Sequence, residues 1–233
     1  MNRRQAIAIV GLPLLLAACF SNRASFRYKL ALTLDTPEGV RSGFSVVEVD
    51  ARDVSIPGRG TMSRVKGEAV YVDLESDARP LVALIADISP RPTGFKWWSE
   101  GIPNTENLLR LYSAPAKSDE TLIDRVGRLA RMRGLIKLTA SDLPDLVTFA
   151  DINDPKSVLK VDPHNLPATL GRDIEWSHIT IEVTNEPVTT GIENKLPWLK
   201  SLQGGLDGSR LRRVDGSLGL ANALNATAFK RGT

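Results

Sequence analysis

Residues 26–51 read FRYKLALTLDTPEGVRSGFSVVEVDA, and this stretch decides the fold. Apolar residues alternate with mostly polar ones from Phe26 to Leu34, which is the period of two of a half-buried strand. Thr36-Pro37-Glu38-Gly39 has the composition of a type I turn. The run 40–51 is again rich in residues that favour strands, so the two runs predict an antiparallel hairpin. The alternation breaks at Val46-Val47, where we expect a bulge.

Two further runs extend this hairpin. A Gly- and Pro-rich stretch over 56–60 leads into the run 68–74, in which alternate residues are apolar. The run 80–86 is short and uniformly apolar, which indicates a buried strand. Four strands joined by short turns predict an N-terminal antiparallel β-meander.

The second half of the chain predicts helices followed by more strands. Ser118-Asp119-Glu120 has the composition of a helix N-cap, and the apolar residues of 122–130 then recur at helical spacing. The remaining predicted elements are a shorter helix over 104–112, strands over 146–149, 158–161 and 178–184, a short helical piece within 187–202, and a weak terminal helix over 218–229. The sequence therefore predicts one α+β domain over 26–233, with a Gly-rich C-terminal segment from about 204.

Composition excludes several classes of protein. The 233 residues include 30 basic and 27 acidic side chains, two His and one Cys, with a formal charge of +3. A single Cys rules out an intrachain disulfide framework and a cysteine-cluster metal site. The small net charge gives no reason to expect nucleic acid as a partner.

The first nineteen residues have the features of a secretory signal. Arg3 and Arg4 precede an uncharged, largely apolar run from Ala6 to Ala18, which is too short to span a bilayer comfortably. The run ends in Leu16-Ala17-Ala18-Cys19, which closely resembles the lipobox of bacterial lipoproteins. In that family the Cys thiol receives a diacylglycerol through a thioether, the chain is cut before the Cys, and the new amino group is usually acylated.

This resemblance implies an anchored mature protein. Residues 1–18 would be a signal peptide, Cys19 would carry the lipid, and 19–25 would be a tether. Removal of residues 1–18 leaves 215 residues, with 28 basic and 27 acidic side chains. Several acyl chains hold a protein firmly to a bilayer. Phe20 stands where enterobacterial lipoproteins retained at the inner membrane carry Asp, so the resemblance favours the periplasmic face of the outer membrane.

Two other export routes stay open. Arg3-Arg4 is the pair found in twin-arginine signals, although the residues that follow match that pattern only in part. Ordinary signal cleavage would instead release a soluble periplasmic protein. The mass of the mature N-terminus tests the second case, because an unmodified N-terminus downstream of Cys19 would overturn the lipoprotein interpretation.

No catalytic, cofactor or metal motif is evident in the sequence. His164 lies in a turn-like segment and His178 at the start of a predicted strand, and neither has a second ligand at metal spacing. We therefore assign no catalytic, cofactor-binding or metal-ligating residue. The alternative to a binding protein is an envelope hydrolase with a dispersed active site, and His178 with Glu182, two positions on one face of the strand, is where such a site would be sought.

Aromatic residues supply the only candidate ligand contacts. Trp97 and Trp98 are adjacent in a segment bounded by Pro92 and Pro103, where no regular element is predicted. Exposed aromatic side chains serve as anchors for a glycan or a protein. Arg125, Arg128 and Arg131 are interpreted as a solvated helix face.

The body also resembles uncharacterised proteobacterial lipoproteins, through 36–43, 186–193 and Leu196-Pro197-Trp198-Leu199. That resemblance brings no activity with it. The expected protein is a lipid-anchored α+β module, held to the membrane through Cys19, that binds or scaffolds another envelope protein or a glycan.

Overall fold

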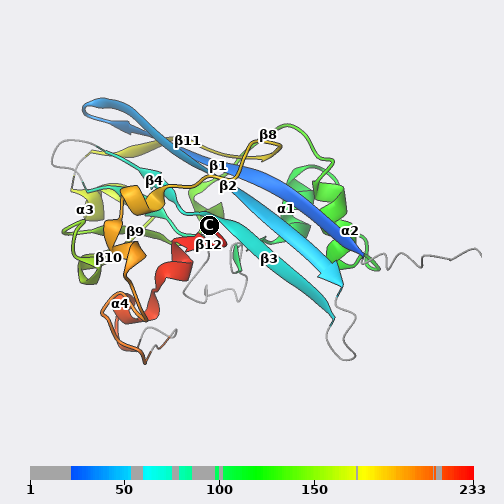
Figure 1. The fold of residues 1–233 in the computed structure, drawn as a ribbon. Helices are drawn as coiled ribbons and strands as arrows, with labels where there is room; N and C mark the ends of the chain where they lie inside the picture. The colour runs from blue at the N-terminus through cyan, green and yellow to red at the C-terminus, as the bar shows by residue number, and fades with distance from the viewer. Residues whose placement is uncertain are drawn as a thin grey trace, which may run out of the picture.

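The computed structural model describes residues 22–53, 60–74, 79–85, 98–99, 102–171, 173–211, 213 and 217–233. Within these residues the chain has the mixed α+β fold that the sequence predicts, as Figure 1 shows. The strands are β1 (Arg23–Thr36), β2 (Gly39–Asp53), β3 (Thr61–Glu68), β4 (Val70–Val72), β5 (Leu81–Ala83), β6 (Trp98–Ser99), β7 (Ile102–Pro103), β8 (Leu135–Lys137), β9 (Leu146–Phe149), β10 (Val158–Val161), β11 (Glu175–Thr184) and β12 (Lys230–Arg231).

Four α-helices lie between or after these strands in the described residues: α1 (Thr105–Leu111), α2 (Leu122–Leu129), α3 (Leu166–Leu170) and α4 (Leu220–Ala223). The short 3-10 helices are η1 (Ala140–Asp142), η2 (Pro155–Ser157), η3 (Ile192–Asn194), η4 (Pro197–Lys200) and η5 (Ala226–Ala228). The predicted helices over 104–112 and 122–130 are thus confirmed. The predicted terminal helix is reduced to α4 and η5.

The larger sheet has six strands in the order β12-β3-β2-β1-β11-β8. The predicted hairpin is present, with β1 and β2 paired antiparallel from Arg23 opposite Arg52 to Thr36 opposite Gly39. On its other side β1 pairs with β11, so the first strand of the body lies inside the sheet. Figure 1 shows α1 and α2 at the end of the long strands where β1 begins, and α3 and α4 toward the other end.

The strands predicted to form one meander are divided between two sheets, with β1 and β2 in the larger sheet and β4 and β5 in a second one. The predicted strand over 68–74 divides at Ala69, because Glu68 ends β3 and Val70 begins β4. The Ala69 N–H donates to Phe229 O at 2.7 Å. The β4–β5 hairpin then joins a four-stranded sheet in the order β10-β9-β5-β4. The strand β3 was not predicted, because most of its residues are exposed and show no apolar alternation.

The two sheets and the first two helices enclose the main core. The alternate residues of β1 from Phe26 to Leu34 are at most 4% exposed, as the period of two predicts. They face α2, on which α1 packs, at one end of the strand and β4 at the other. A second core, on the other side of the four-stranded sheet, is made by the C-terminal segment and includes Phe149, Ile192, Leu196, Leu199, Leu224 and Phe229.

A crossing segment, which we call the strap (residues 185–191), runs over the outer face of the six-stranded sheet. Lys29 Nζ lies 2.8 Å from Glu186 Oε1, and Thr189 exchanges two hydrogen bonds with the backbone of Val46. Val46 is therefore fully buried beneath the strap while Val47 is buried in the main core. Burial on both faces explains the broken alternation, so the expected bulge at Val46-Val47 is wrong. The irregularity lies between Thr33 and Leu34, opposite β11.

Candidate functional site

The outer face of the six-stranded sheet is strongly polar between the strap and the end where β1 begins. Antiparallel pairing places Arg23 opposite Arg52, and it places Glu48 between Arg27 on β1 and Lys66 on β3. Between these two sets of residues, Asp50 of β2 lies opposite Ser25 of β1 on one side and Arg64 of β3 on the other. We call the five cations of this area the basic face; they are Arg23, Arg27, Arg52, Arg64 and Lys66. A hollow of about 320 Å³ lies over it, lined in part by Arg23, Asp50, Arg52 and Arg64.

A second hollow, the helix pocket, lies between the start of β1 and α2. Its volume is about 510 Å³, and its lining includes residues 22–24 on one side and α2 with the preceding loop on the other. Arg23 lines both hollows. Side chains of both signs face the helix pocket, including Lys117, Asp119 and Arg131. A pocket of this size and polarity can hold a small polar group or the side chains of a partner.

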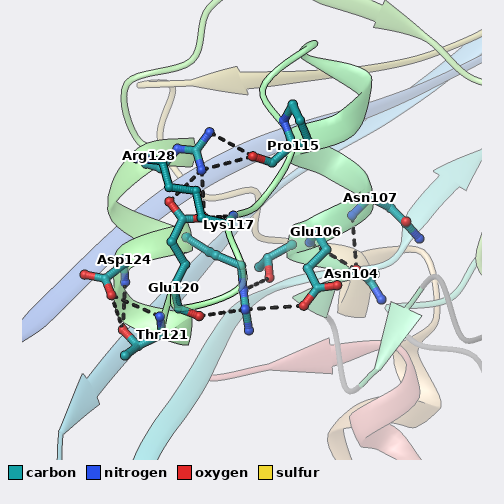
Figure 2. Close-up of polar contacts among 11 residues, drawn as sticks. Asn104, Glu106, Asn107, Pro115, Lys117, Glu120, Thr121, Asp124 and Arg128 are labelled. Atoms are coloured by element: carbon teal, nitrogen blue, oxygen red, sulfur yellow. Dashed lines mark hydrogen bonds and ion pairs between the residues drawn. The ribbon is translucent and has the colours of Figure 1, made fainter.

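The wall of the helix pocket is fixed by the capping of α2. Thr121 is the N-cap, with its Oγ1 accepting from the Asp124 N–H at 3.2 Å while Asp124 Oδ2 accepts from the Thr121 N–H at 3.0 Å (Figure 2). This reciprocal pair is a capping box with Asp in the third position. The helix therefore begins after Thr121, three residues later than the Ser118 cap predicted from sequence.

Two arginines of α2 are structural rather than solvated. The Arg128 guanidinium lies 2.5 Å from Glu120 Oε1 and donates to Ala114 O at 2.8 Å. Arg125 donates to Thr105 Oγ1 at 3.2 Å and to Glu120 O at 2.9 Å, so it links α2 to α1. The expectation of a solvated face at Arg125 and Arg128 is therefore wrong. Arg131, beyond the helix end, is exposed.

These contacts lower the pKa values of two carboxyl groups that line the helix pocket, those of Glu120 and Asp124. Hydrogen bonds from Arg128 and from the Lys117 N–H hold the pKa of Glu120 below its ordinary value. The hydroxyl and backbone N–H of Thr121 do the same for the pKa of Asp124. In the C-terminal segment, the Ser209 N–H and the Asn222 amide lower the pKa of Asp207. Each of these carboxylates therefore stays ionised in a structural hydrogen-bond network.

The lowered pKa of Glu120 predicts a pH-dependent contribution to stability. Because the folded-state pKa lies below the unfolded one, the contribution is present above the ordinary carboxyl pKa and is lost as the pH falls through the folded-state value. We expect Glu120→Gln to unfold at lower urea than the wild type at pH 7. The difference should shrink as the pH falls below about 4. Urea midpoints measured across this range test it.

The matched control is Asp119→Asn, which alters an exposed neighbour in the same loop. It should change the urea midpoint little at any pH. If the urea midpoints of Glu120→Gln and wild type differ by the same amount at pH 7 and below about pH 4, the role given to Glu120 is contradicted.

The residues predicted to carry function from sequence lie largely outside the described part of the chain. Cys19 and Trp97 are among the residues that the structure does not describe. Trp98 begins the two-residue strand β6, of which only the backbone is described. Lipidation at Cys19 and ligand contact at Trp97 and Trp98 stay predictions.

The histidine positions are described, and the structure does not bring His178 and Glu182 together. His178 is exposed, with its Nδ1 3.2 Å from Ser177 Oγ. Glu182 is on the same strand, four residues on, which corresponds to about 13 Å. His164 lies in a turn, where its N–H donates to Asp162 Oδ1 at 2.9 Å. Among the described residues, no group of three or more His, Cys, Asp and Glu is placed to hold a metal ion.

The chain matches no protein-family model, no curated protein and no solved structure. None of the described helices is long and apolar enough to cross a membrane. The candidate site is therefore assigned from the arrangement of its residues in the structure alone. Sequence reasoning missed the basic face because β3, which supplies Arg64 and Lys66, was not predicted. The charge alternation R-V-K over 64–66 is the signal that could have indicated it.

Proposed function

We propose that the protein is a lipid-anchored module of the bacterial cell envelope that binds or scaffolds another envelope component. The anchor is the lipidated Cys19, the body faces the periplasm, and the outer membrane is favoured over the inner membrane because Phe20 follows the Cys. The resemblance of Leu16-Ala17-Ala18-Cys19 to a lipobox supports this assignment.

The observation that carries the proposal is the short distance along the chain from Cys19 to the folded body. β1 begins at Arg23, three residues before the strand start expected from sequence. Cys19 precedes Arg23 by four residues, and four residues span at most about 14 Å. A lipid on Cys19 would hold the start of β1, and with it the helix pocket and the basic face, close to the bilayer surface.

The mixed lining of the helix pocket suits a binding role at that surface. Lys117, Asp119 and Arg131 are exposed side chains of both signs around a hollow of about 510 Å³. Such a lining favours polar partners with both donors and acceptors, a description that fits an envelope protein or a glycan.

The anchor is tested by metabolic labelling with a fatty acid, followed by mass spectrometry of the mature N-terminus. The wild type is expected to incorporate the label and to begin at an acylated Cys19. Cys19→Ser should lose the label completely, because the hydroxyl cannot replace the thiol in the thioether. Ser21→Ala, a change of similar size two residues away, should retain it. An unmodified N-terminus downstream of Cys19 in the wild type would overturn the anchor.

The binding role is tested by co-purification from extracted membranes. An envelope component retained by the wild type and by Arg210→Glu, but lost from Arg131→Glu, would place the contact at the helix pocket. Equal retention by all three proteins would remove the helix pocket from the proposal.

A further inference from the structure

The basic face has more positive charge than its own acids neutralise. Arg23 Nε lies 2.5 Å from Asp50 Oδ2, and Arg27 Nε lies 2.7 Å from Glu48 Oε2. These two pairs use both acids of the area. Arg64 lies opposite Asp50 and Lys66 opposite Glu48 in the sheet, but among the described residues both acids form their ion pairs with β1. The five cations of the basic face and its two acids therefore leave a net charge of about three positive units on this area.

The basic face is also open to the outside. Arg64 and Lys66 are exposed, and the Arg23 side chain is 62% exposed in spite of its ion pair. Met62, which pairs with Arg52, adds an exposed apolar side chain at the outer end of β3. The strap borders this area at Arg27, which donates to Glu186 O at 3.3 Å, and crosses the sheet farther along, at Val46. Cations mixed with an exposed apolar residue are typical of surfaces that lie against lipid headgroups.

The position of Arg23 at the start of β1 indicates which partner the basic face binds. Arg23 is both a member of the basic face and the first residue of β1, within about 14 Å of Cys19 along the chain. We propose that the basic face docks on the anionic phospholipid headgroups of the membrane that holds Cys19, and so fixes the orientation of the body on the bilayer. This inference rests on the lipid anchor of the proposed function. Charge complementarity and the short tether both select the membrane surface as the occupant.

The effect of each charge on the ratio of docked to free protein can be stated in advance. Each Lys or Arg held near an anionic surface favours the docked state by roughly fivefold. Replacing Arg64 by Glu removes one favourable charge and adds one unfavourable charge, which should shift the docked-to-free ratio by about 25-fold. Salt well above the physiological range should undock the wild type, because exposed charges are screened over a few ångströms there.

The test uses the full-length protein purified with its lipid and incorporated into vesicles. One set contains phosphatidylcholine alone, and the other contains added phosphatidylglycerol. An amine-reactive label then reports on Lys66 in the basic face and on Lys200, an exposed lysine of η4 outside the basic face, as the internal reference. Labelling of Lys66 relative to Lys200 should fall in the anionic vesicles and recover at high salt.

The variants are Arg64→Glu and Arg210→Glu, which change two exposed arginines in the same way. Arg64→Glu should restore Lys66 labelling in anionic vesicles, and Arg210→Glu should leave it protected. Equal Lys66 labelling of vesicle-bound wild type in both lipids overturns the docking alone. A chain that binds neither kind of vesicle overturns the anchor as well. Protection by soluble polyphosphate but not by anionic vesicles assigns the face to a soluble polyanion and overturns membrane docking.

Discussion

Replacing Glu68 by Ala is expected to lower the free energy of unfolding by about 3 kcal/mol. Glu68 is only 4% exposed. Its Oε2 accepts from the Ile192 N–H at 2.7 Å, and its Oε1 lies 3.3 Å from Thr233 Oγ1. The side chain therefore joins the end of β3 to the first residue of η3 and to the last residue of the chain.

The size of the effect follows from what Ala leaves behind. The Ile192 N–H would lose an acceptor that carries a charge, in a place that water does not reach easily, and Ile192 itself is part of the second core. Hydrogen bonds to charged groups contribute about 1.5–3 kcal/mol, and a buried donor without a partner adds its own desolvation cost. Urea unfolding followed by circular dichroism measures the change.

Glu68→Gln separates the hydrogen bond from the charge. The amide oxygen can still accept from the Ile192 N–H, so we expect a smaller loss, about 1 kcal/mol. Glu186→Gln, in the exposed strap, is the matched control and should stay within about 0.5 kcal/mol of wild type. If Glu68→Ala is as stable as this control, the buried carboxylate does not hold the C-terminal segment to the sheet.

Replacing Gly43 by Ala is expected to lower the free energy of unfolding by about 3 kcal/mol. Gly43 lies on the inner face of β2, where the second sheet comes closest. A Cβ at this position would lie 2.3 Å from Tyr71 O and 3.0 Å from Tyr71 C. Both are backbone atoms of β4, so neither can move without shifting the strand. The two sheets can approach this closely only because position 43 has no side chain.

Gly127→Ala is the matched control, because it adds the same methyl group to another glycine near the main core. The added Cβ would lie 3.7 Å from Ala24 Cβ, an ordinary contact, and Ala favours the helix by up to about 1 kcal/mol. Thermal unfolding should show a lower midpoint for Gly43→Ala and an unchanged or higher one for Gly127→Ala. Two variants with equal midpoints would mean that β2 and β4 have room to separate.

The hairpin could be predicted from sequence because its signal is local. The alternation from Phe26 to Leu34 and the turn at Pro37-Glu38 depend only on neighbours in the chain, and both are found where expected. The helix α2 was predicted for the same reason, although its cap was misplaced because Ser118 and Thr121 are both good N-cap residues. Only the fold shows which of the two has Asp124 as a partner.

Features that depend on distant contacts were not predictable in this way. The burial of Val46 depends on the strap, more than 130 residues later in the chain. The position of Arg64 opposite Asp50 in the sheet could be found only with β3, whose exposed residues lack an apolar period. The roles of Arg125 and Arg128 required the loop carbonyls that they bind. In each case the deciding partner lies in a segment with no recognisable relation to it in the sequence.

The interior position of β1 has a consequence for how the chain folds. One neighbour of β1, the strand β2, follows within a few residues, but the other, β11, is formed by residues 175–184. The chain therefore has high contact order around its first strand, and such pairings form slowly. During synthesis the amino end of the chain is available long before residues 175–184 are made. Until then the β1–β2 hairpin has an open edge, and an unpaired strand edge is a site at which chains aggregate.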